Sequence, residues 1–232
     1  MAPWRPTKEW AGETAFIVGG GPSALHADLS TLRGRKVIAI NSSWRAMPWA
    51  DFLVFSDNRW WAEHGPILLD ESQRQRPAVF GGRIVAVTTT ITLPVLYEVG
   101  RENKPGLCRD PGAVMIRRTT LTAALNLAYH LGASRMILLG VDGKAAENGR
   151  THHHEAHPWP QRPGCWDEQR VDVAAIAADL AREGIKVINA SPGSALDLWK
   201  VLPLPDAIAL FEAQRRCTVD PMPVPAGMVL IP

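Results

Sequence analysis

Short apolar runs recur along the chain, and most of them end in glycine or in a small polar residue. Such runs are typical of strands that are buried on both faces of a parallel sheet. They predict strands over 14–18, 36–40, 51–55, 78–80, 84–88, 135–141 and 186–190. Apolar residues at helical spacing lie between them, over 22–32, 59–69, 119–131 and 172–183. The alternation predicts a three-layer, Rossmann-like α/β domain with a mostly parallel sheet.

The segments between these elements give weaker signals. Residues 91–111 contain several Gly, Pro and Asn residues and read as loops, and residues 143–168 read as a loop or lid. A short helix is expected after Ser191–Ser194, up to Lys200.

The chain shows no internal repeat and no clear domain boundary, which predicts a single domain over residues 1–232. The core is expected over about 14–200. The proline-rich remainder, 201–232, is expected to be an arm that packs outside the sheet or on a partner chain. A homo-oligomer therefore stays open.

The stretch TAFIVGGGPSAL, residues 14–25, organises this pattern as strand, glycine turn and helix start. Gly19, Gly20 and Gly21 let the backbone turn sharply and approach a ligand, and a side chain at Gly21 is expected to obstruct that approach. Pro22 and Ser23 suit a first helical turn, where free N–H groups attract phosphate. The stretch matches neither the dinucleotide fingerprint nor the P-loop. A tight turn without a ligand is the alternative.

Polar side chains follow three of the predicted strands. Asn41 and Asp57 follow the second and third strands, and Asp142 follows the strand over 135–141. Carboxyl ends of parallel strands meet at one edge of the sheet, so these residues are expected to gather there with Gly20 and Ser23. Capping of the next helix explains Asp57 equally well, whereas the glycine after Asp142 favours a site.

The loop over 143–168 contains the densest titratable cluster, formed by His152, His153, His154, Glu155 and His157. A histidine there could act as a general base, because its pKa lies near neutrality. A metal site and a solvated loop are the alternatives, and the zincin spacing is absent. Residues 144–166 are expected to be more mobile than the core and to order when ligand binds.

Two arginines, Arg117 and Arg118, precede the predicted helix start at Thr119 and Thr120. Guanidinium groups beside free helix N–H groups would suit a phosphate. Surface salt bridges explain the two arginines equally well.

Composition narrows the classes of protein that fit. The formal net charge of +2 over 232 residues gives no sign of a sequence-independent nucleic-acid binder. The odd number and wide spacing of Cys108, Cys165 and Cys217 argue against a disulfide framework. No apolar signal core or membrane-length apolar run is present. These features predict a cytoplasmic protein without a membrane partner.

Several short motifs occur in a characteristic order: the Gly-Gly-Gly-Pro-Ser turn, Ala39-Ile40-Asn41-Ser42, Asp57, Thr119-Thr120, Leu131-Gly132-Ala133, Gly140-Val141-Asp142 and Asn189-Ala190-Ser191-Pro192-Gly193-Ser194. In this order the chain resembles the family 42 sialyltransferases and the related 6-hydroxymethylpterin diphosphokinase-like (MptE-like) proteins, a group with phage and prophage members. The resemblance covers about residues 14–200.

The resemblance implies that a CMP-type nucleotide donor is bound by the glycine turn, by the residue after the second strand and by the Thr-Thr helix start. Carried over, these residues are Gly19, Gly20, Gly21, Pro22, Ser23, Asn41, Thr119 and Thr120, with Ser194 near the nucleotide. It also implies a histidine base, for which His154 or His157 could serve. The diphosphokinase-like relatives transfer diphosphate from ATP with magnesium, and Asp57 and Asp142 would suit that chemistry.

The function expected from these observations is a nucleotide-binding transferase that uses a nucleotide-activated donor, by glycosyl or diphosphate transfer. His154, His157 and Asp142 are its candidate catalytic residues, and magnesium is the one cofactor left open. A non-catalytic nucleotide-binding or phage assembly protein is one alternative. A metal-dependent hydrolase that uses the His152–His157 cluster is another.

Overall fold

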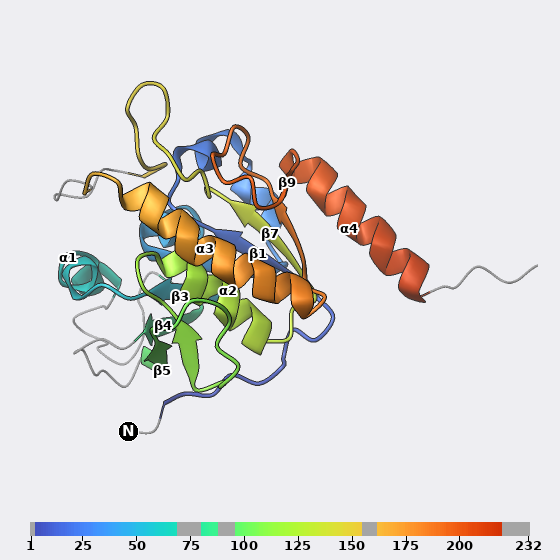
Figure 1. Cartoon of the computed structure of the whole chain (residues 1–232), viewed down its shortest axis with the longest axis horizontal. Helices are drawn as coiled ribbons and strands as arrows, with labels where there is room; N and C mark the ends of the chain where they lie inside the picture. The colour runs from blue at the N-terminus through green and yellow to red at the C-terminus, as the bar shows by residue number, and fades with distance from the viewer. Residues whose placement is uncertain (1–2, 69–79, 88–95, 155–161, 220–232) are drawn as a thin grey trace, which may run out of the picture.

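A sheet of parallel strands organises the computed structural model, which describes residues 3–68, 80–87, 96–154 and 162–219 (Figure 1). The sheet has nine strands in this part of the chain: β1 (Thr14–Val18), β2 (Lys36–Ile40), β3 (Phe52–Phe55), β4 (Arg83–Val87), β5 (Leu96–Glu102), β6 (Ala113–Met115), β7 (Arg135–Leu139), β8 (Lys186–Asn189) and β9 (Lys200–Val201). The α-helices are α1 (Asn58–Leu68), α2 (Thr120–His130), α3 (Cys165–Arg182) and α4 (Leu204–Val219). Three 3-10 helices complete the fold: η1 (Pro22–His26), η2 (Leu29–Leu32) and η3 (Asn41–Ala46).

The strand order is β6-β5-β4-β3-β2-β1-β7-β8-β9. The chain builds outward from β1 to β6 and then returns through α2 to add β7 on the other side of β1. The order therefore reverses between β1 and β7, and ligands of open α/β sheets bind outside the carboxyl ends of the strands at such a point. Val18 pairs with Leu139 in the register of these two strands, so Gly19 and Gly140 follow side by side.

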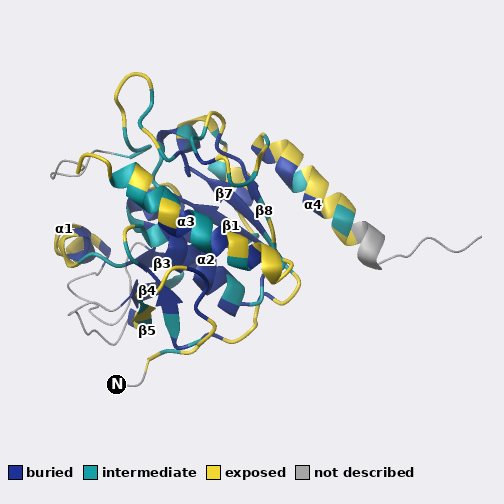
Figure 2. Ribbon diagram, in the orientation of Figure 1, coloured by how far each residue is buried: buried dark blue, intermediate teal, exposed yellow. Residues whose placement is uncertain are grey.

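Both faces of the sheet are covered, which gives three layers (Figure 2). Apolar side chains of α2 and α3 pack on one face, against strand residues such as Ile17 and Leu138. The other face is covered by side chains of η2, η3, α1 and α4, which pack against residues such as Phe16 and Leu139. Burial on both faces explains why the strands read as continuous apolar runs.

The α/β fold is confirmed, and so are several of its elements. The strands expected over 14–18 and 36–40 have the expected bounds, and those expected over 51–55, 84–88, 135–141 and 186–190 differ by one or two residues at an end. The helix expected over 119–131 is α2, and the one over 59–69 is α1. The strand expected over 78–80 lies mostly outside the described residues.

Two of the helix predictions differ from the structure. The helix expected over 22–32 is replaced by η1 and η2, because Asp28 caps a new turn by accepting a hydrogen bond from the amide of Ser30. The helix expected over 172–183 begins at Cys165, seven residues earlier, so it includes the four residues 165–168 that were assigned to the lid. Gly164 precedes it, and Asp167 and Glu168 lie in its first turn, where acidic side chains suit the helix dipole.

Two further segments differ from the secondary structure that was expected for them. The region 91–111 was expected to be loops, but it contains β5, which has seven residues, and the three-residue β6 follows it; both lie at one end of the sheet. The short helix expected before Lys200 is absent. Instead, Ser194 Oγ donates to the carbonyl of Val141 and the amide of Ala195 donates to that of Asp142, so this segment is tied to the end of β7.

The segment that was expected to be an arm contains the end of β9 and then α4. Leu204, Ala207 and Phe211 of α4 are buried in the same apolar cluster as Phe16 and Leu139. α4 is therefore part of the layer that covers the sheet. Among the helices in the described ranges, none combines the length and the apolar character needed to cross a membrane.

Packing of α4 can be tested with two neighbouring residues. Phe211 is 4% exposed, whereas Leu210, one position earlier on the helix, is 36% exposed. We expect Phe211→Ala to lower the free energy of unfolding by about 3 kcal/mol, because it removes buried apolar surface and leaves a cavity. Leu210→Ala should change it by less than about 1 kcal/mol. Equal urea midpoints for the two variants would contradict the packing described here.

Candidate functional site

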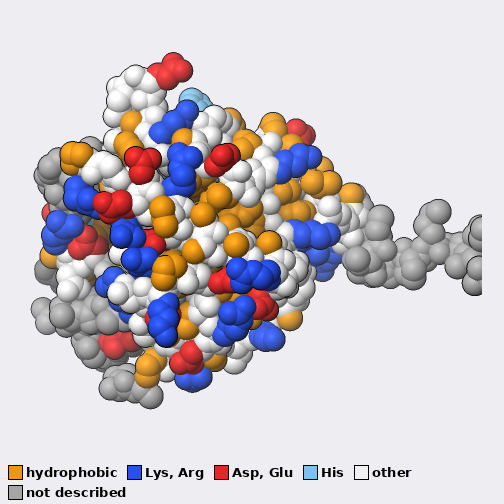
Figure 3. Space-filling model, viewed as in Figure 1, with side chains coloured by type: hydrophobic (Ala, Val, Ile, Leu, Met, Phe, Trp, Pro, Cys, Tyr) orange, Lys and Arg blue, Asp and Glu red, His pale blue; other side chains and the backbone are white. Residues whose placement is uncertain are grey.

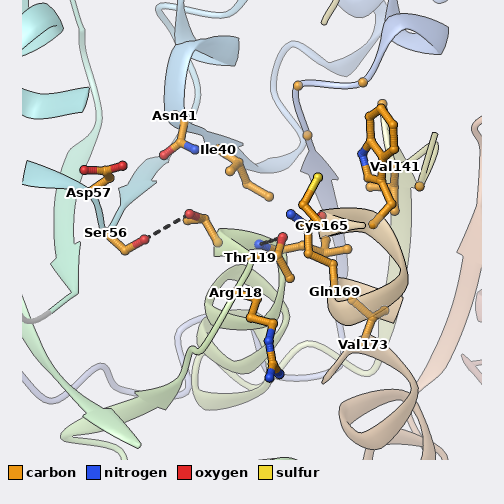
Figure 4. Close-up of a pocket in the computed structure, with 18 of the residues that line it drawn as sticks. Ile40, Asn41, Ser56, Asp57, Arg118, Thr119, Val141, Cys165, Gln169 and Val173 are labelled. Carbon is orange, nitrogen blue, oxygen red and sulfur yellow. Dashed lines mark hydrogen bonds between the residues drawn. The ribbon is translucent and has the colours of Figure 1, made fainter. Parts of the chain in front are cut away.

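A pocket of about 1320 Å³ lies at the carboxyl ends of the strands, where β1 and β7 diverge (Figure 4). It extends from the glycine turn after β1 to Val87 and Arg101 on β4 and β5, and the N-terminal ends of α2 and α3 line it as well. Its lining includes nine of the residues predicted for the site: Gly19, Gly20, Gly21, Asn41, Asp57, Thr119, Thr120, Asp142 and His154. The gathering of strand ends that the sequence predicted is therefore present.

The glycine turn packs tightly against the end of β7. The amide of Gly21 donates to the carbonyl of Gly140 over 2.8 Å. A Cβ built on Gly19 would lie 2.7 Å from that carbonyl oxygen, and one built on Gly21 would lie 2.6 Å from it and collide with the carboxylate of Asp142. The expectation that a side chain at Gly21 would meet a ligand is therefore wrong, because it would meet the protein first. Gly20 differs, since its Cβ would face His152 and His154 at 3.2 and 3.3 Å.

The carboxylate of Asp142 holds the turn in place. It is only 7% exposed, and its Oδ2 accepts hydrogen bonds from the hydroxyl of Ser23 at 2.9 Å and from the amide of Ser23 at 3.4 Å. Burial raises the pKa of Asp142 above its ordinary value, while these hydrogen bonds and the nearby charge of Lys144 act in the opposite direction. Ser23 thus serves the site through Asp142 and does not line the pocket.

Hydrogen bonds within the protein occupy most amides of the glycine turn. Gly19 donates to Leu139, Gly21 to Gly140 and Ser23 to Asp142, and Pro22 has no amide hydrogen. Within the described residues, Gly20 has the one amide of the turn for which the structure gives no acceptor. The turn can therefore offer a ligand one N–H group rather than a cradle of several.

Asn41 has a conformation that is rare for residues other than glycine. Its φ is +48°, and its side-chain Oδ1 is buried with no hydrogen-bond partner among the described residues. Figure 4 shows this side chain above the same space as Ser56 and Thr119. A buried acceptor without a donor is costly unless a ligand or water supplies one. Asn41 is thus ready to accept a hydrogen bond from an N–H or O–H group.

The N-terminus of α2 faces this space. Thr119 caps the helix, with its Oγ1 accepting from the amide of Leu121, and the hydroxyls of Thr120 and Ser56 lie 3.0 Å apart (Figure 4). The first amides of a helix have no partner within the helix and carry partial positive charge. This end of α2 can therefore stabilise an anionic group.

Asp57 lies in the pocket but is paired with a neighbour. Its carboxylate accepts from the backbone amide and the guanidinium of Arg59, with Oδ2 3.0 Å from Nη2. Partial burial acts to raise the pKa of Asp57, but the hydrogen bonds and charge of Arg59 outweigh it and hold the pKa below its ordinary value. Asp57 thus both caps α1 and lines the pocket.

The two aspartates do not form a common magnesium site. Asp57 follows β3 and Asp142 follows β7, three strands further along the sheet. Neighbouring strands lie about 4.8 Å apart, which separates these strand ends by roughly 14 Å, whereas magnesium binds oxygen at about 2.1 Å. The described residues also contain no group of three or more His, Cys, Asp or Glu side chains arranged to hold a metal ion. They therefore do not fit a magnesium site built by the protein alone.

The histidine loop is attached to the glycine turn. The amide of His153 donates to the carbonyl of Gly20 over 2.9 Å, and its ring Nε2 lies 3.0 Å from the hydroxyl of Ser43. Ser43 in turn donates to the carbonyl of Gly19 at 3.0 Å, so Nε2 of His153 carries the proton of that contact. Burial, helped by the charge of Arg150, lowers the pKa of His153 to about 4. This histidine is neutral at pH 7 and joins the loop to the turn.

The rings of His152 and His154 lie 4.8 Å apart, and both residues line the pocket beside Gly20. His154 is therefore placed as predicted. His157, the other candidate base, lies outside the described residues. Residues 155–161 of the segment 144–166 lie outside them as well, and the mobility of the segment stays a prediction.

Basic side chains outnumber acidic ones around the pocket, although most of them are paired. Arg117 and Arg118 both bond the carboxylate of Asp172, which is fully buried on α3, at 3.0 to 3.2 Å. The salt bridges that the sequence left open for these two arginines are thus present, and both residues also line the pocket. Over the wider face that α3 covers, basic and acidic side chains are interspersed (Figure 3).

Two of the lining cations form no ion pair with a carboxylate in the described parts of the chain. They are Arg101 on β5 and Lys144 after β7, which lie toward opposite ends of the pocket. Sequence reasoning missed both of them, as well as the residues Cys165, Trp166, Gln169 and Arg170 at the start of α3. Gly164, with the acidic residues Asp167 and Glu168 after it, was a signal that could have placed this helix start correctly.

Besides Ser23, two predicted residues lie beside the pocket without lining it. Pro22 is buried as the first residue of η1, and Ser194 donates to the carbonyl of Val141. Ser194 therefore fixes the end of β7, and any effect on a ligand would pass through that strand end.

Comparisons of this chain with protein-family models, with curated proteins and with solved structures found no match.

The two glycines of the turn give a matched pair of variants. We expect Gly21→Ala to lower the free energy of unfolding by about 2 kcal/mol or more, because its Cβ would collide with Asp142 and the carbonyl of Gly140. Gly20→Ala should cost much less, since the imidazole rings that it meets can shift. Thermal and urea unfolding measure both effects. A Gly21→Ala protein as stable as the parent would contradict the packing of the turn.

The pKa of His153 predicts a dependence of stability on pH. It is about 4 in the folded protein and near 6.5 in the unfolded chain, so between these values the unfolded state binds more protons. The contribution is present above pH 6.5 and is lost as the pH falls toward 4, by about 3 kcal/mol in all. We expect His153→Gln to remove this part of the pH dependence. Urea unfolding from pH 7 to pH 4 measures the difference, and parallel curves for parent and variant would contradict it.

Proposed function

We propose that the pocket binds a nucleotide-activated donor and that the protein is a transferase of the glycosyltransferase-like or diphosphokinase-like kind. The observation that carries the proposal is the convergence, at the switch point between β1 and β7, of features that suit a nucleotide. Lys144, the amide of Gly20 and the N-terminus of α2 offer positive charge or N–H groups to an anion. Ile40, Val141 and Trp166 give the same pocket apolar walls.

The resemblance noted in the sequence supports the same assignment. Of the positions that it relates to a CMP-type donor, the three glycines of the turn, Asn41, Thr119 and Thr120 line this pocket, whereas Pro22, Ser23 and Ser194 lie beside it. The unpartnered Oδ1 of Asn41 suits a ribose hydroxyl or a base amino group. The phosphates belong near Gly20 and Lys144, because that end has an available amide and an unpaired cation.

A transferase also needs a group that accepts the proton of the attacking acceptor. His154 is the candidate histidine that the structure describes, and its Nε2 would lie 3.3 Å from a Cβ on Gly20. In this proposal His154 is the general base. Asp142 is better assigned as a positioning residue, because its carboxylate is buried and bonded to Ser23.

The non-catalytic alternative uses the same pocket and differs only in turnover. A nucleotide-binding or phage assembly protein would need the glycine turn, Asn41 and α2, but it would not need His154. The metal-dependent hydrolase has less support, because the described histidines form no metal-binding group of three ligands.

Lys144 provides the direct test of nucleotide binding. We expect the parent to bind CMP, CTP or ATP at millimolar concentration or below in isothermal titration calorimetry. Lys144→Gln should weaken that affinity about tenfold, because it removes a charged partner of the phosphates. Lys104→Gln is the matched control, since Lys104 is exposed and outside the pocket, and its affinity should equal that of the parent.

The same samples separate the alternatives. Release of free nucleotide from a CMP-sugar or from ATP, lost in His154→Gln while binding persists, would support a transferase. Binding without any donor consumption would favour the non-catalytic protein. A parent protein that binds none of the three nucleotides would overturn the proposal.

A further inference from the structure

The end of the pocket at β4 and β5 is lined by charged and apolar side chains that a donor bound at the glycine turn would not contact. Val87, Arg101, Ile116 and Arg117 line it, far from the glycine turn. Arg101 is on β5 and Lys144 follows β7, five strands further along the sheet. At about 4.8 Å for each strand, these strand ends are separated by roughly 24 Å. Arg101 and Lys144 therefore cannot share one anionic group.

The pocket is large for a single substrate. Its volume of about 1320 Å³ exceeds the ~300–1000 Å³ that is typical of ligand pockets. A transferase must hold donor and acceptor together, so a pocket that continues beyond the donor positions has room for the second molecule.

Arg101 is held in place without being neutralised. Its Nε donates to the carbonyl of Ile116 over 3.0 Å, and the amide of Ile116 donates to the carbonyl of Glu102 over 3.1 Å. These bonds join β5 to the segment before α2 and keep Arg101 next to Arg117. Nε is engaged by a neutral carbonyl, and no carboxylate among the described residues pairs with the guanidinium group.

The neighbouring arginines add to this excess of positive charge. Arg117, Arg118 and Arg162 share two carboxylates, those of Asp172 and Glu168. Asp172 is fully buried, so its ion pairs hold Arg117 and Arg118 at the wall of the pocket. A fixed guanidinium group with unused donors recognises the two oxygens of a carboxylate or phosphate.

We infer that this end of the pocket is the acceptor subsite and that Arg101, assisted by Arg117, selects an acceptor that carries an oxyanion. The inference rests on the proposed function and adds to it the chemical class of the second substrate. Val87 and Ile116 supply an apolar surface for the body of that acceptor.

The test uses inorganic phosphate and succinate as probes, each titrated into the protein with and without saturating CTP. Arginine Nε–Hε signals in ¹⁵N NMR spectra report binding, and the signal that disappears in Arg101→Gln identifies Arg101. We expect one or both probes to shift the Arg101 signal whether or not CTP is present. The affinity, followed in the variants through the Arg117 signal, should fall about tenfold or more in Arg101→Gln. It should be restored only in part in Arg101→Lys, because an ammonium group keeps the charge but not the paired donors of a guanidinium.

The matched control is Arg109→Gln, which removes the same charge from an exposed arginine that pairs with Glu183 outside the pocket. It should bind both probes as the parent does. A phosphate response without a succinate response would assign a phosphorylated acceptor, and the reverse would assign a carboxylate.

Failure of this inference is distinguishable from failure of the proposed function. Nucleotide binding with no Arg101-dependent response to either probe would overturn the acceptor subsite alone. Probe binding that CTP abolishes by competition would also overturn it, because the anion would then occupy the donor site. An Arg101-dependent response in a protein that binds no nucleotide would keep the oxyanion subsite and overturn the donor assignment.

Discussion

The site depends on the contact between the glycine turn after β1 and the end of β7. Gly19 and Gly140 lie side by side without side chains, which lets the two strand ends approach closely enough for Gly21 to bond the carbonyl of Gly140. Asp142 then reaches the turn and bonds Ser23. Two parallel strands joined by a long crossover would otherwise separate at their ends. Here the hydrogen bonds of the turn hold them together, and the residues of this contact form one wall of the pocket.

This contact also explains the distribution of charge in the pocket. The buried carboxylate of Asp142 and the internal hydrogen bonds of the turn use most of the local donors, so an anion at the β1 end must depend on Gly20, α2 and Lys144. At the other end the arginines are anchored by Asp172 on α3. A buried carboxylate therefore fixes positive charge at the arginine end alone. The two lining cations without an ion pair in the described parts of the chain, Arg101 and Lys144, lie toward opposite ends of the pocket.

Much of the fold could be predicted because buried parallel strands leave a local signal in the sequence. The strands at 14–18 and 36–40 have continuous apolar runs that end clearly in glycine or in a polar residue. The residues that follow such strands could therefore be predicted to line the site, and many of them do. The start of α3 could not be predicted in the same way, because Cys165–Arg170 are mostly polar and the helix is fixed there by packing and by the bonds of Arg118 to Glu168 and Asp172. The role of Gly21 was also hidden, since the atoms that it avoids belong to Gly140 and Asp142, over a hundred residues away.

Hydrogen bonds connect the histidine loop to the glycine turn and to η3. Carbonyls of Gly19 and Gly20 accept hydrogen bonds from Ser43 and from the amide of His153, so η3, the turn and the loop share one set of bonds. Because the ring of His153 is neutral, it can be buried there without placing a positive charge beside the carbonyls. A ligand that bonds the amide of Gly20 would polarise the same peptide unit and strengthen its neighbouring bonds. Binding at the turn would thereby strengthen the attachment of the loop that carries His154, which already lies beside Gly20.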